Sequence, residues 1–395
     1  MKALHLSLSY KSAPALGGPD LTVYKLCTAL GRAGVNVDVI STNLASRTTV
    51  LQPESFERMV DGIHVNYLAA RKLIPLGRNS FGLYCVPSLR PLLRSRISEY
   101  DIVHLHGYRD YISVVGSREA RKHGIPYVVH PRGTIPYQGH SIIPKACFDS
   151  TVGRRMIQCA AGLVALSERE VESFRRLRAE PARIEVVRNG LESRDYDPHA
   201  RGDQFRQRHG IGERFVVLYF GRIHVIKGID YMIRAVAHLR RQGVDTAAVV
   251  VGPDEGYGAK LARLARKEGL QGHLYLIPTV GEVDAKREVF AAADVLVYAA
   301  AVEDFGVSAF EGILSGVPTV VAAGTGCGEI VQQLDAGTLV SYGDVNELCR
   351  VLHDILSHPA KARQRALSAR PNIIHLLDWN AIARQVQRFY ERVCT

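Results

Sequence analysis

Two glutamates, Glu303 and Glu311, stand eight positions apart in the segment EDFGVSAFE. The apolar run 294–301 comes before them, and the apolar segment 316–321 follows. This pattern predicts a strand, a loop, a helix and a second strand, with Glu303 in the loop and Glu311 about two turns into the helix. Ligands of open α/β sheets bind where strands end and helices begin. Two carboxylates there suit a polyhydroxylated ligand, such as a sugar joined to a ribose.

A second polar segment, GRIHVIKG, follows the apolar run 215–220 and precedes a helical pattern. It places Arg222 and Lys227 five positions apart, with a glycine on either side of the pair. Two cations and a helix N-terminus can bind one anionic group, and a phosphate or diphosphate is the natural candidate. The segment lacks the spacing of a Walker A loop. An ordinary surface loop with two basic side chains is the alternative interpretation.

Other polar or small residues stand at the ends of predicted strands. Gly17 and Gly18 follow the first strand and would let backbone approach a ligand closely, although a plain turn explains them equally well. Four further candidates lie at later strand ends: His104, His106, His130 and Arg132. A lone histidine at such a place is more often structural than catalytic. The one Asp-x-Asp motif, at 195–197, falls in a predicted linker, which argues against a metal site for a sugar nucleotide.

Predicted strands and helices alternate along the whole chain, which indicates parallel sheets covered on both faces. In the first half we expect strands at 2–9, 35–42, 64–68, 101–107, 125–130, 162–167 and 184–188. In the second half we expect them at 215–220, 247–251, 274–277, 295–298 and 318–322. The length of 395 residues favours two domains. The polar segment 191–202 is the predicted linker between them.

Composition narrows the class of protein. With 47% hydrophobic and 23% charged residues the chain has the make-up of a globular domain, and it contains no apolar run long enough for a transmembrane helix. The first ten residues alternate like a strand and do not resemble a signal peptide. Seven cysteines without a Cys-x-x-Cys pair give no support to zinc ribbons or thioredoxin-like chemistry. These features together predict a cytoplasmic location.

The net charge of +11 is unevenly distributed. The segment 71–98 has six basic residues and no acidic one: Arg71, Lys72, Arg78, Arg90, Arg94 and Arg96. A solvated basic face is one interpretation. The other is a peripheral contact with anionic lipid headgroups at the inner face of the cytoplasmic membrane, or with an anionic acceptor. No nucleic-acid-binding motif accompanies this charge, so we expect no nucleic acid partner.

Taken together, these motifs resemble the retaining glycosyltransferases of family 4, which have the GT-B fold. The resemblance covers nearly the whole chain, and its most specific parts are the Glu-x7-Glu motif at 303–311 and the Arg222–Lys227 loop. The segments 17–18, 101–107, 188–191, 251–255 and 316–320 fit as well. It implies an α/β architecture of two doubly wound, Rossmann-like domains facing across a cleft. Their expected bounds are 1–195 for the acceptor side and 196–375 for the nucleotide sugar, and a helix at 376–395 would cross back towards the first domain.

The resemblance also implies roles for individual residues. Arg222 and Lys227 would be catalytic, because they would neutralise the donor diphosphate, and no metal or other cofactor is therefore expected. Glu303 would hold hydroxyls of the donor sugar, and Glu311 would hold the ribose hydroxyls. The other donor-binding positions would act through backbone groups: Gly17, Gly18, Phe305, Gly306 and Val307. The family usually has a histidine in the register of Arg132, with His130 two residues earlier, so both remain candidates for lining the sugar pocket.

The expected activity is transfer of a hexosyl group, with retention, from a nucleoside-diphosphate sugar to a hydroxyl acceptor. The acceptor would be a carbohydrate or a lipid-linked glycan in cell-surface polysaccharide synthesis. A GT-B epimerase or phosphorylase is one alternative, and a non-catalytic sugar-nucleotide-binding protein is another. If Lys227 neutralises the diphosphate, Lys227→Ala should cut turnover severely and leave folding intact.

Overall fold

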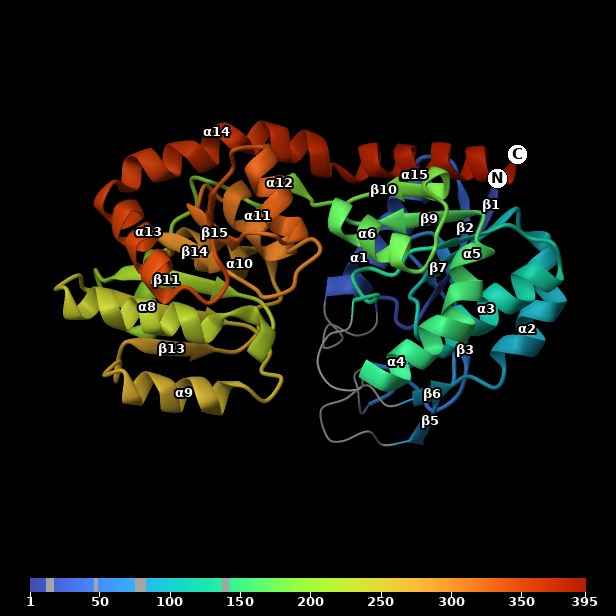
Figure 1. The fold of residues 1–395 in the computed structure, drawn as a ribbon, viewed down its shortest axis with the longest axis horizontal. Coiled ribbons are helices and arrows are strands. Elements are labelled where there is room, and N and C mark those ends of the chain that lie inside the picture. Colours follow the sequence, from blue (N-terminus) through green and yellow to red (C-terminus); the bar gives the residue numbers. More distant parts are fainter. Residues whose placement is uncertain (12–17, 46–48, 75–82, 137–141) are drawn as a thin grey trace. The chain divides into compact units, whose positions relative to one another are not determined.

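The computed structural model describes residues 1–395 except 12–17, 46–48, 75–82 and 137–141 (Figure 1). Contacts divide the chain into two compact units. The first unit comprises Met1–Gly190 and Trp379–Thr395, and the second comprises Leu191–Asp378. Each unit contains one large sheet with helices between most of its successive strands, which is the α/β architecture that the alternation of elements predicts.

The first unit has an eight-stranded sheet in the order β10-β9-β8-β7-β1-β2-β4-β3. Its strands are β1 (Lys2–Ser7), β2 (Asn36–Thr42), β3 (Phe56–Val60), β4 (Ile63–Leu68), β7 (Ile102–His106), β8 (Tyr127–Val129), β9 (Gly162–Ala165) and β10 (Ile184–Val186). All neighbours run parallel except β3, which pairs antiparallel with β4. A separate two-stranded sheet pairs β5 (Arg71–Ile74) antiparallel with β6 (Leu83–Cys85). The sequence did not predict β3, β5 or β6, because short or largely exposed strands lack the buried apolar run that marks the others.

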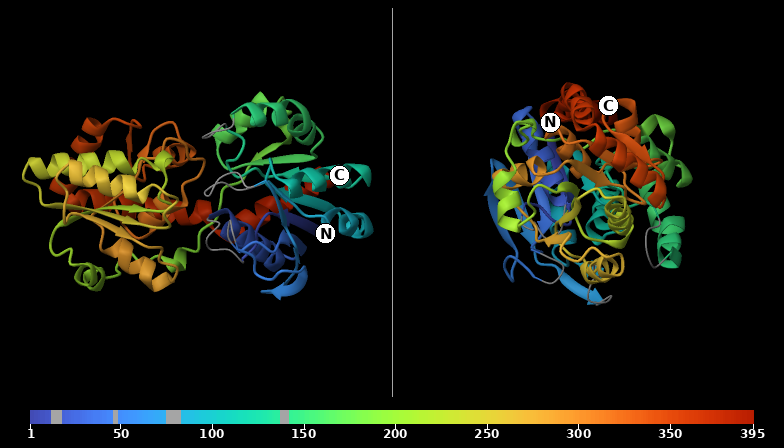
Figure 2. Two further views of the ribbon diagram at one scale, coloured as in Figure 1. Left: turned by 90° about the horizontal axis from the view of Figure 1, so that it is seen from below. Right: turned by 90° about the vertical axis from the view of Figure 1, so that its left-hand side faces the viewer.

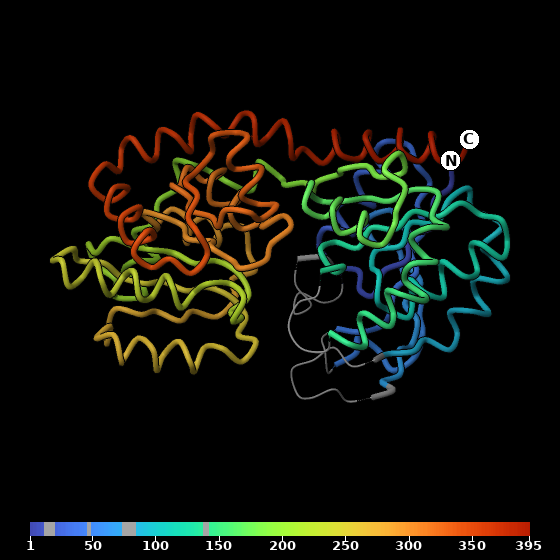
Figure 3. The backbone as a smooth tube through the Cα atoms, viewed as in Figure 1, coloured from blue at the N-terminus to red at the C-terminus, as the bar shows by residue number. Residues whose placement is uncertain are grey.

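Helices cover both faces of this sheet. They are α1 (Gly18–Arg32), α2 (Leu89–Arg96), α3 (Tyr111–Lys122), α4 (Ile142–Phe148), α5 (Arg154–Gln158), α6 (Glu168–Arg176) and α15 (Trp379–Cys394). Because side chains alternate along a strand, Leu4 and Leu6 pack in one core cluster while Ala3 packs in another with residues of α1 and α15. The tube in Figure 3 shows the last helix of the chain returning to lie along the unit that contains the first strand.

The second unit has a six-stranded, fully parallel sheet in the order β13-β12-β11-β14-β15-β16. Its strands are β11 (Phe215–Phe220), β12 (Thr246–Val251), β13 (Leu274–Ile277), β14 (Val295–Tyr298), β15 (Thr319–Ala322) and β16 (Thr338–Val340). Its helices are α7 (Asp203–His209), α8 (Ile229–Arg241), α9 (Gly258–Lys267), α10 (Val283–Ala291), α11 (Val307–Leu314), α12 (Gly326–Gln333), α13 (Val345–Ser357) and α14 (Pro359–Leu377). Helix α8 contacts α9 and α13, whereas α10 contacts α7 and α11 contacts α14. The left view in Figure 2 shows helices on both faces of this sheet.

In each sheet the chain reverses, at one place, the direction in which it adds strands. This switch lies between β1 and β7 in the first unit and between β11 and β14 in the second. Ligands of doubly wound sheets bind outside the carboxyl ends of the strands at such a point. The topology therefore directs attention to the residues that follow these two pairs of strands.

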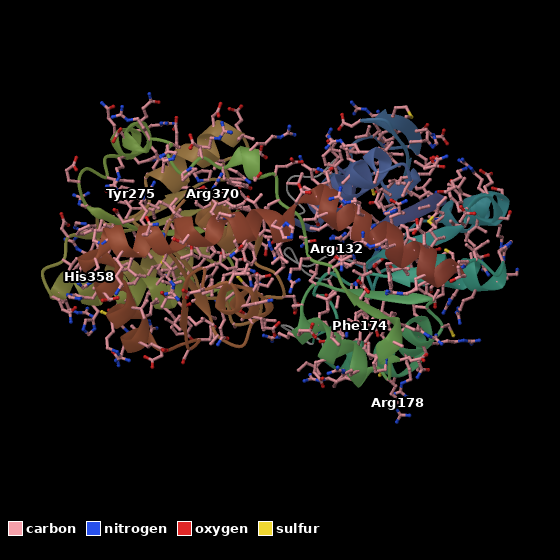
Figure 4. All side chains as sticks on the ribbon, turned by 90° about the horizontal axis from the view of Figure 1, so that it is seen from above. Arg132, Phe174, Arg178, Tyr275, His358 and Arg370 are labelled. Atoms are coloured by element: carbon pink, nitrogen blue, oxygen red, sulfur yellow. The ribbon has the colours of Figure 1, made fainter. Side chains whose placement is uncertain are left out.

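The segment 191–202, predicted to be a polar linker, packs closely on the second unit. Leu191, Tyr196 and Gly202 are buried. Arg287 on α10 donates hydrogen bonds to the carbonyls at 194 and 195. Arg370, which is labelled on α14 in Figure 4, donates to the carbonyl of Tyr196. The boundary between the two units falls at the start of this segment, and its polar composition gave no sign that Tyr196 is buried.

Three of the six basic side chains in the segment 71–98 lie close to acidic side chains of the first unit. Arg90 and Arg94 donate to the buried carboxylate of Glu119 at 2.8 and 3.3 Å, and Arg96 lies 3.6 Å from Glu99. Arg71 and Lys72 are exposed, and Arg78 lies outside the described residues. Among the described helices, none is both long and apolar enough to cross a membrane.

Candidate functional site

A buried ion pair lies at the switch point of the second sheet. Lys227 ends a short 3-10 turn (Val225–Lys227) after β11, and Glu303 follows β14. The Nζ of Lys227 lies 2.7 Å from Oε2 of Glu303, and the Tyr298 hydroxyl donates to the same oxygen at 2.8 Å. The side chain of Lys227 is only 7% exposed, and that of Glu303 is 19% exposed. Burial alone would raise the pKa of Glu303, but Lys227 holds that pKa below its ordinary value, so the carboxylate is charged.

Glu311 is held by the same two kinds of group. Helix α11 places it in its second turn, where the Tyr196 hydroxyl donates to Oε1 at 2.7 Å. The Lys286 ammonium, from α10, donates to the same oxygen at 3.0 Å. Burial and the nearby Glu311 raise the pKa of Tyr196, so its phenol stays protonated and remains a donor. Each glutamate of the Glu-x7-Glu motif is thus bound on one oxygen by a lysine and a tyrosine.

Arg222 has a different carboxylate as its partner. Its Nη1 donates to both oxygens of Glu255, at 2.9 and 3.1 Å. Burial disfavours the charge on Arg222, but Glu255 more than compensates and the pKa of Arg222 is raised. The loops that carry Arg222 and Glu255 are in close contact. Gly252 has a φ of +147°, and a Cβ there would lie 2.0 Å from the Gly221 carbonyl oxygen. A diphosphate that binds both Arg222 and Lys227 must therefore compete with Glu255.

The predicted donor-binding backbone lies beside Glu303. The N–H of Phe305 contacts Oε1 of Glu303 at 3.4 Å, and Phe305 itself is buried. Gly306 caps α11 with a φ of +72°, and a Cβ there would meet the Cys327 sulfur at 2.9 Å. Val307 begins the helix, and the first N–H groups of a helix have no acceptor within it. Anions are favoured at such an end.

Four buried histidines gather near the switch point of the first sheet. His5 lies on β1, His104 and His106 lie on β7, and His130 follows β8. Burial lowers the pKa of each imidazole, and the neighbouring Arg132 lowers it further. The pKa of His5 falls to about 3. The group is therefore neutral at ordinary pH, with its polar atoms enclosed in protein.

Arg132 sets the direction of the hydrogen bonds in this group. Its Nε and Nη2 lie 3.3 and 3.1 Å from Nδ1 of His106. A guanidinium only donates, so His106 must accept at Nδ1 and carry its proton on Nε2. That proton goes to Nδ1 of His5 at 2.8 Å, and His5 in turn donates from Nε2 to the Tyr390 hydroxyl at 3.3 Å. Tyr390 then donates to Nδ1 of His104, which leaves the His104 proton on Nε2.

The same order of protons makes this group a poor metal site. His5, Cys27 and His106 lie close enough to hold one ion, as do His104, His106 and His130. Coordination needs a free lone pair on each ring. The lone pairs of His5, His104 and His106 already accept hydrogen bonds, and the Arg132 cation at His106 would repel a second cation.

The first unit turns Arg132 inward. Its backbone has a φ of +55°, which is uncommon for a residue other than glycine, and its Nη1 donates to Thr22 at 3.1 Å and Asn189 at 2.9 Å. His130 is 2% exposed, and neither of its ring nitrogens has a partner among the described residues. Gly18 is the first residue of α1, and Gly17 lies outside the described residues. Contact of any of these residues with a donor remains a prediction.

Sequence reasoning missed several polar partners. These are His5, Tyr196, Glu255, Lys286, Tyr298 and Tyr390. Tyr298 had a usable signal, because it ends the predicted strand that leads to Glu303. The sequence around Tyr196 was misleading, because this residue stands between the two aspartates of the Asp-x-Asp motif that was assigned to a linker. Its contact with Glu311 joins residues 115 positions apart, which spacing cannot reveal.

Comparisons with known families match almost the whole chain in two parts. The family model described as glycosyl transferases group 1 matches residues 202–370, and that of a glycosyl transferase 4-like domain matches residues 17–190. A curated relative, the D-inositol 3-phosphate glycosyltransferase of a Nocardioides species, is 28% identical over 99% of this chain and 89% of its own length. The protein of that name from Mycobacterium marinum is 27% identical over 94% of this chain and 80% of its own.

Solved structures agree in fold. Sucrose-phosphate synthase from Thermosynechococcus elongatus has a TM-score of 0.82 at 21% identity, covering 99% of this chain and 98% of its own. Anabaena HepE, solved in complex with UDP-glucose, has a TM-score of 0.78 at 22% identity, covering 99% and 100%. At these identities the likeness establishes the fold, which is GT-B.

Proposed function

Since the chain belongs to the family 4-like glycosyltransferases with the GT-B fold, we propose that this hexosyltransferase uses a nucleoside-diphosphate sugar and retains the anomeric configuration. The observation that carries the proposal is the pair formed by Lys227 and Glu303 at the switch point of the second sheet. A cation and a carboxylate at hydrogen-bond distance can receive the two ends of one donor, its phosphate and its sugar hydroxyls. The family match favours sugar transfer over the epimerase, phosphorylase and non-catalytic alternatives.

In this proposal the chain's own side chains supply the positive charge that the leaving diphosphate needs. Lys227 stabilises the phosphate oxygens, and Arg222 joins it after leaving Glu255. The start of α11, at Gly306 and Val307, adds N–H groups. No metal is then required. With the donor so held, the departing phosphate itself can take the proton of the acceptor hydroxyl, which agrees with retention by front-side attack.

The acceptor and the location belong to the same proposal. We infer a carbohydrate or lipid-linked glycan acceptor in cell-surface polysaccharide synthesis, and a cytoplasmic protein. Peripheral contact with an anionic membrane would rest on the exposed Arg71 and Lys72, since Arg90, Arg94 and Arg96 already face acidic side chains.

The test is a panel of nucleotide sugars, beginning with UDP-glucose, measured by thermal shift and by release of nucleoside diphosphate. A true donor should raise the melting temperature by mass action. Turnover should survive EDTA, and NMR of the product should give the same anomeric configuration as the donor. Lys227→Met should abolish turnover, whereas Lys260→Met, at an exposed lysine of the same unit, should not. A product of inverted configuration would refute retention, and full turnover in Lys227→Met would refute the role given to that lysine.

A further inference from the structure

Glu311 keeps one carboxylate oxygen for the protein and leaves the other available. Tyr196 and Lys286 both donate to Oε1, and the structure gives no hydrogen bond from any described residue to Oε2. Building on the proposed function, we propose that Tyr196 and Lys286 are positioning residues that orient Glu311 so that Oε2 receives the ribose diol of the donor. They thereby set the preference for ribonucleotides over deoxyribonucleotides.

The positive charge of Lys286 offsets the cost of burying the Glu311 carboxylate. Glu311 is 4% exposed, and burying a carboxylate costs free energy unless a cation or several hydrogen-bond donors accompany it. Lys286 keeps a 24% exposed side chain, and its ammonium also lies over the Phe220 ring, 5.6 Å from the centroid. With Oε1 fixed by two donors, Oε2 still has two lone pairs, which match two adjacent hydroxyls.

Tyr196 is held in place by its backbone as well as by Glu311. Arg370 donates from Nη2 to the Tyr196 carbonyl at 3.2 Å and from Nε to the Leu314 carbonyl at 3.0 Å. Leu314 is the last residue of α11, the helix that carries Glu311, so one arginine ties both ends of the contact together. Arg287, next to Lys286 on α10, grips the carbonyls at 194 and 195. The two donors are therefore fixed before a ligand binds, which is the condition for selectivity.

Glu303, eight positions earlier in the chain, supports the interpretation by repeating the arrangement. Its Oε2 is bound by Lys227 and Tyr298, again one ammonium and one phenol on a single oxygen. The two sets share no residue and come from different elements. In this proposal, one lysine and one tyrosine prepare each glutamate of the Glu-x7-Glu motif to meet hydroxyl groups.

The experiment measures binding of four probes by titration calorimetry: UDP, 2′-deoxy-UDP, ADP and 2′-deoxy-ADP. Wild type should bind the ribose form of one base about 10-fold more tightly than its deoxy form, the usual worth of a hydrogen bond to a charged group. Tyr196→Phe and Lys286→Met should each reduce this ratio several-fold, towards the value of Glu311→Gln. Lys286→Arg should recover much of it, and Lys260→Met should leave it unchanged.

The outcomes separate this inference from the proposed function. If wild type binds none of the four probes and no nucleotide sugar of the wider panel, the proposed function fails. If wild type prefers ribose and the variants weaken both forms equally, the ratio stays constant and the positioning role is overturned while the function stands. Tyr196→Phe removes one hydroxyl without changing the shape of the ring, so this variant should fold even if Lys286→Met does not. Circular dichroism checks that each variant is folded.

Discussion

The ion pair between Lys227 and Glu303 changes what a substitution of Lys227 should do. Sequence reasoning expected Lys227→Ala to spare folding, but the lysine is 7% exposed and lies 2.7 Å from the Glu303 carboxylate. Removing one partner of a buried pair usually costs about 3–5 kcal/mol, because the other charge is left unpaired. Glu303 keeps Tyr298 as a donor and has a 19% exposed side chain, so we expect about 3 kcal/mol for Lys227→Met.

A double-mutant cycle separates this loss of stability from the loss of catalysis. Lys227→Met and Glu303→Gln should each destabilise the second unit, and the double variant should be more stable than either because no unpaired charge remains. The expected coupling is about 2 kcal/mol or more. Turnover should be lost in the double variant as well, since the cation for the phosphate is missing.

The assay must report on the second unit. Trp379, the one tryptophan of the chain, belongs to the first unit, so its fluorescence is an indirect probe. Hydrogen exchange of peptides from β14 and α11, together with urea unfolding followed by circular dichroism, gives the local stability at pH 7. At that pH the pair contributes fully, because the lowered pKa of Glu303 means that its stabilisation is lost only in acid. A coupling below about 0.5 kcal/mol would refute the reasoning, and Lys260→Met is the matched control.

Two further predictions concern folding. The four buried histidines have lower pKa values in the folded state than in the unfolded state. Above about pH 6.5 they should therefore not lower the free energy of unfolding. Below that pH the free energy of unfolding should fall by about 1 kcal/mol per pH unit for each histidine that protonates only on unfolding. Trp379 fluorescence in urea should follow this loss between pH 7 and 5, and a flat profile would contradict it. Gly252→Ala should destabilise the second unit by more than 2 kcal/mol because its Cβ would meet the Gly221 carbonyl, whereas Gly281→Ala, with open space around it, should be close to neutral in the same unfolding assay.

The sequence predicted most closely the strands that form continuous apolar runs. The strands expected at 215–220, 274–277 and 295–298 have these same bounds in the structure, because continuous apolar runs between glycines and polar turns leave little choice. Strands β3 and β5 were not predicted. Most residues of β3 are exposed and β5 begins with two basic residues, so neither strand forms a continuous apolar run.

The candidate site was only half visible in the sequence. Glu303, Glu311, Arg222 and Lys227 stand in recognisable local patterns, and the structure places them at the carboxyl edge of one sheet. Their partners come from remote parts of the chain, as with Lys227 and Glu303, which are 76 positions apart. Such pairs depend on tertiary packing, and a single sequence contains no record of them.

The division of the chain has a consequence for its synthesis. The second unit is one continuous segment, Leu191–Asp378, so all of its strands leave the ribosome before helix α15 is made. The first unit needs that helix, because Tyr390 completes the hydrogen bonds of His5 and His104, and Trp379 and Phe389 pack in its core. Although it begins first, the first unit must therefore finish folding after the second, and a released chain that ends at residue 378 should contain a folded second unit and an incompletely folded first one.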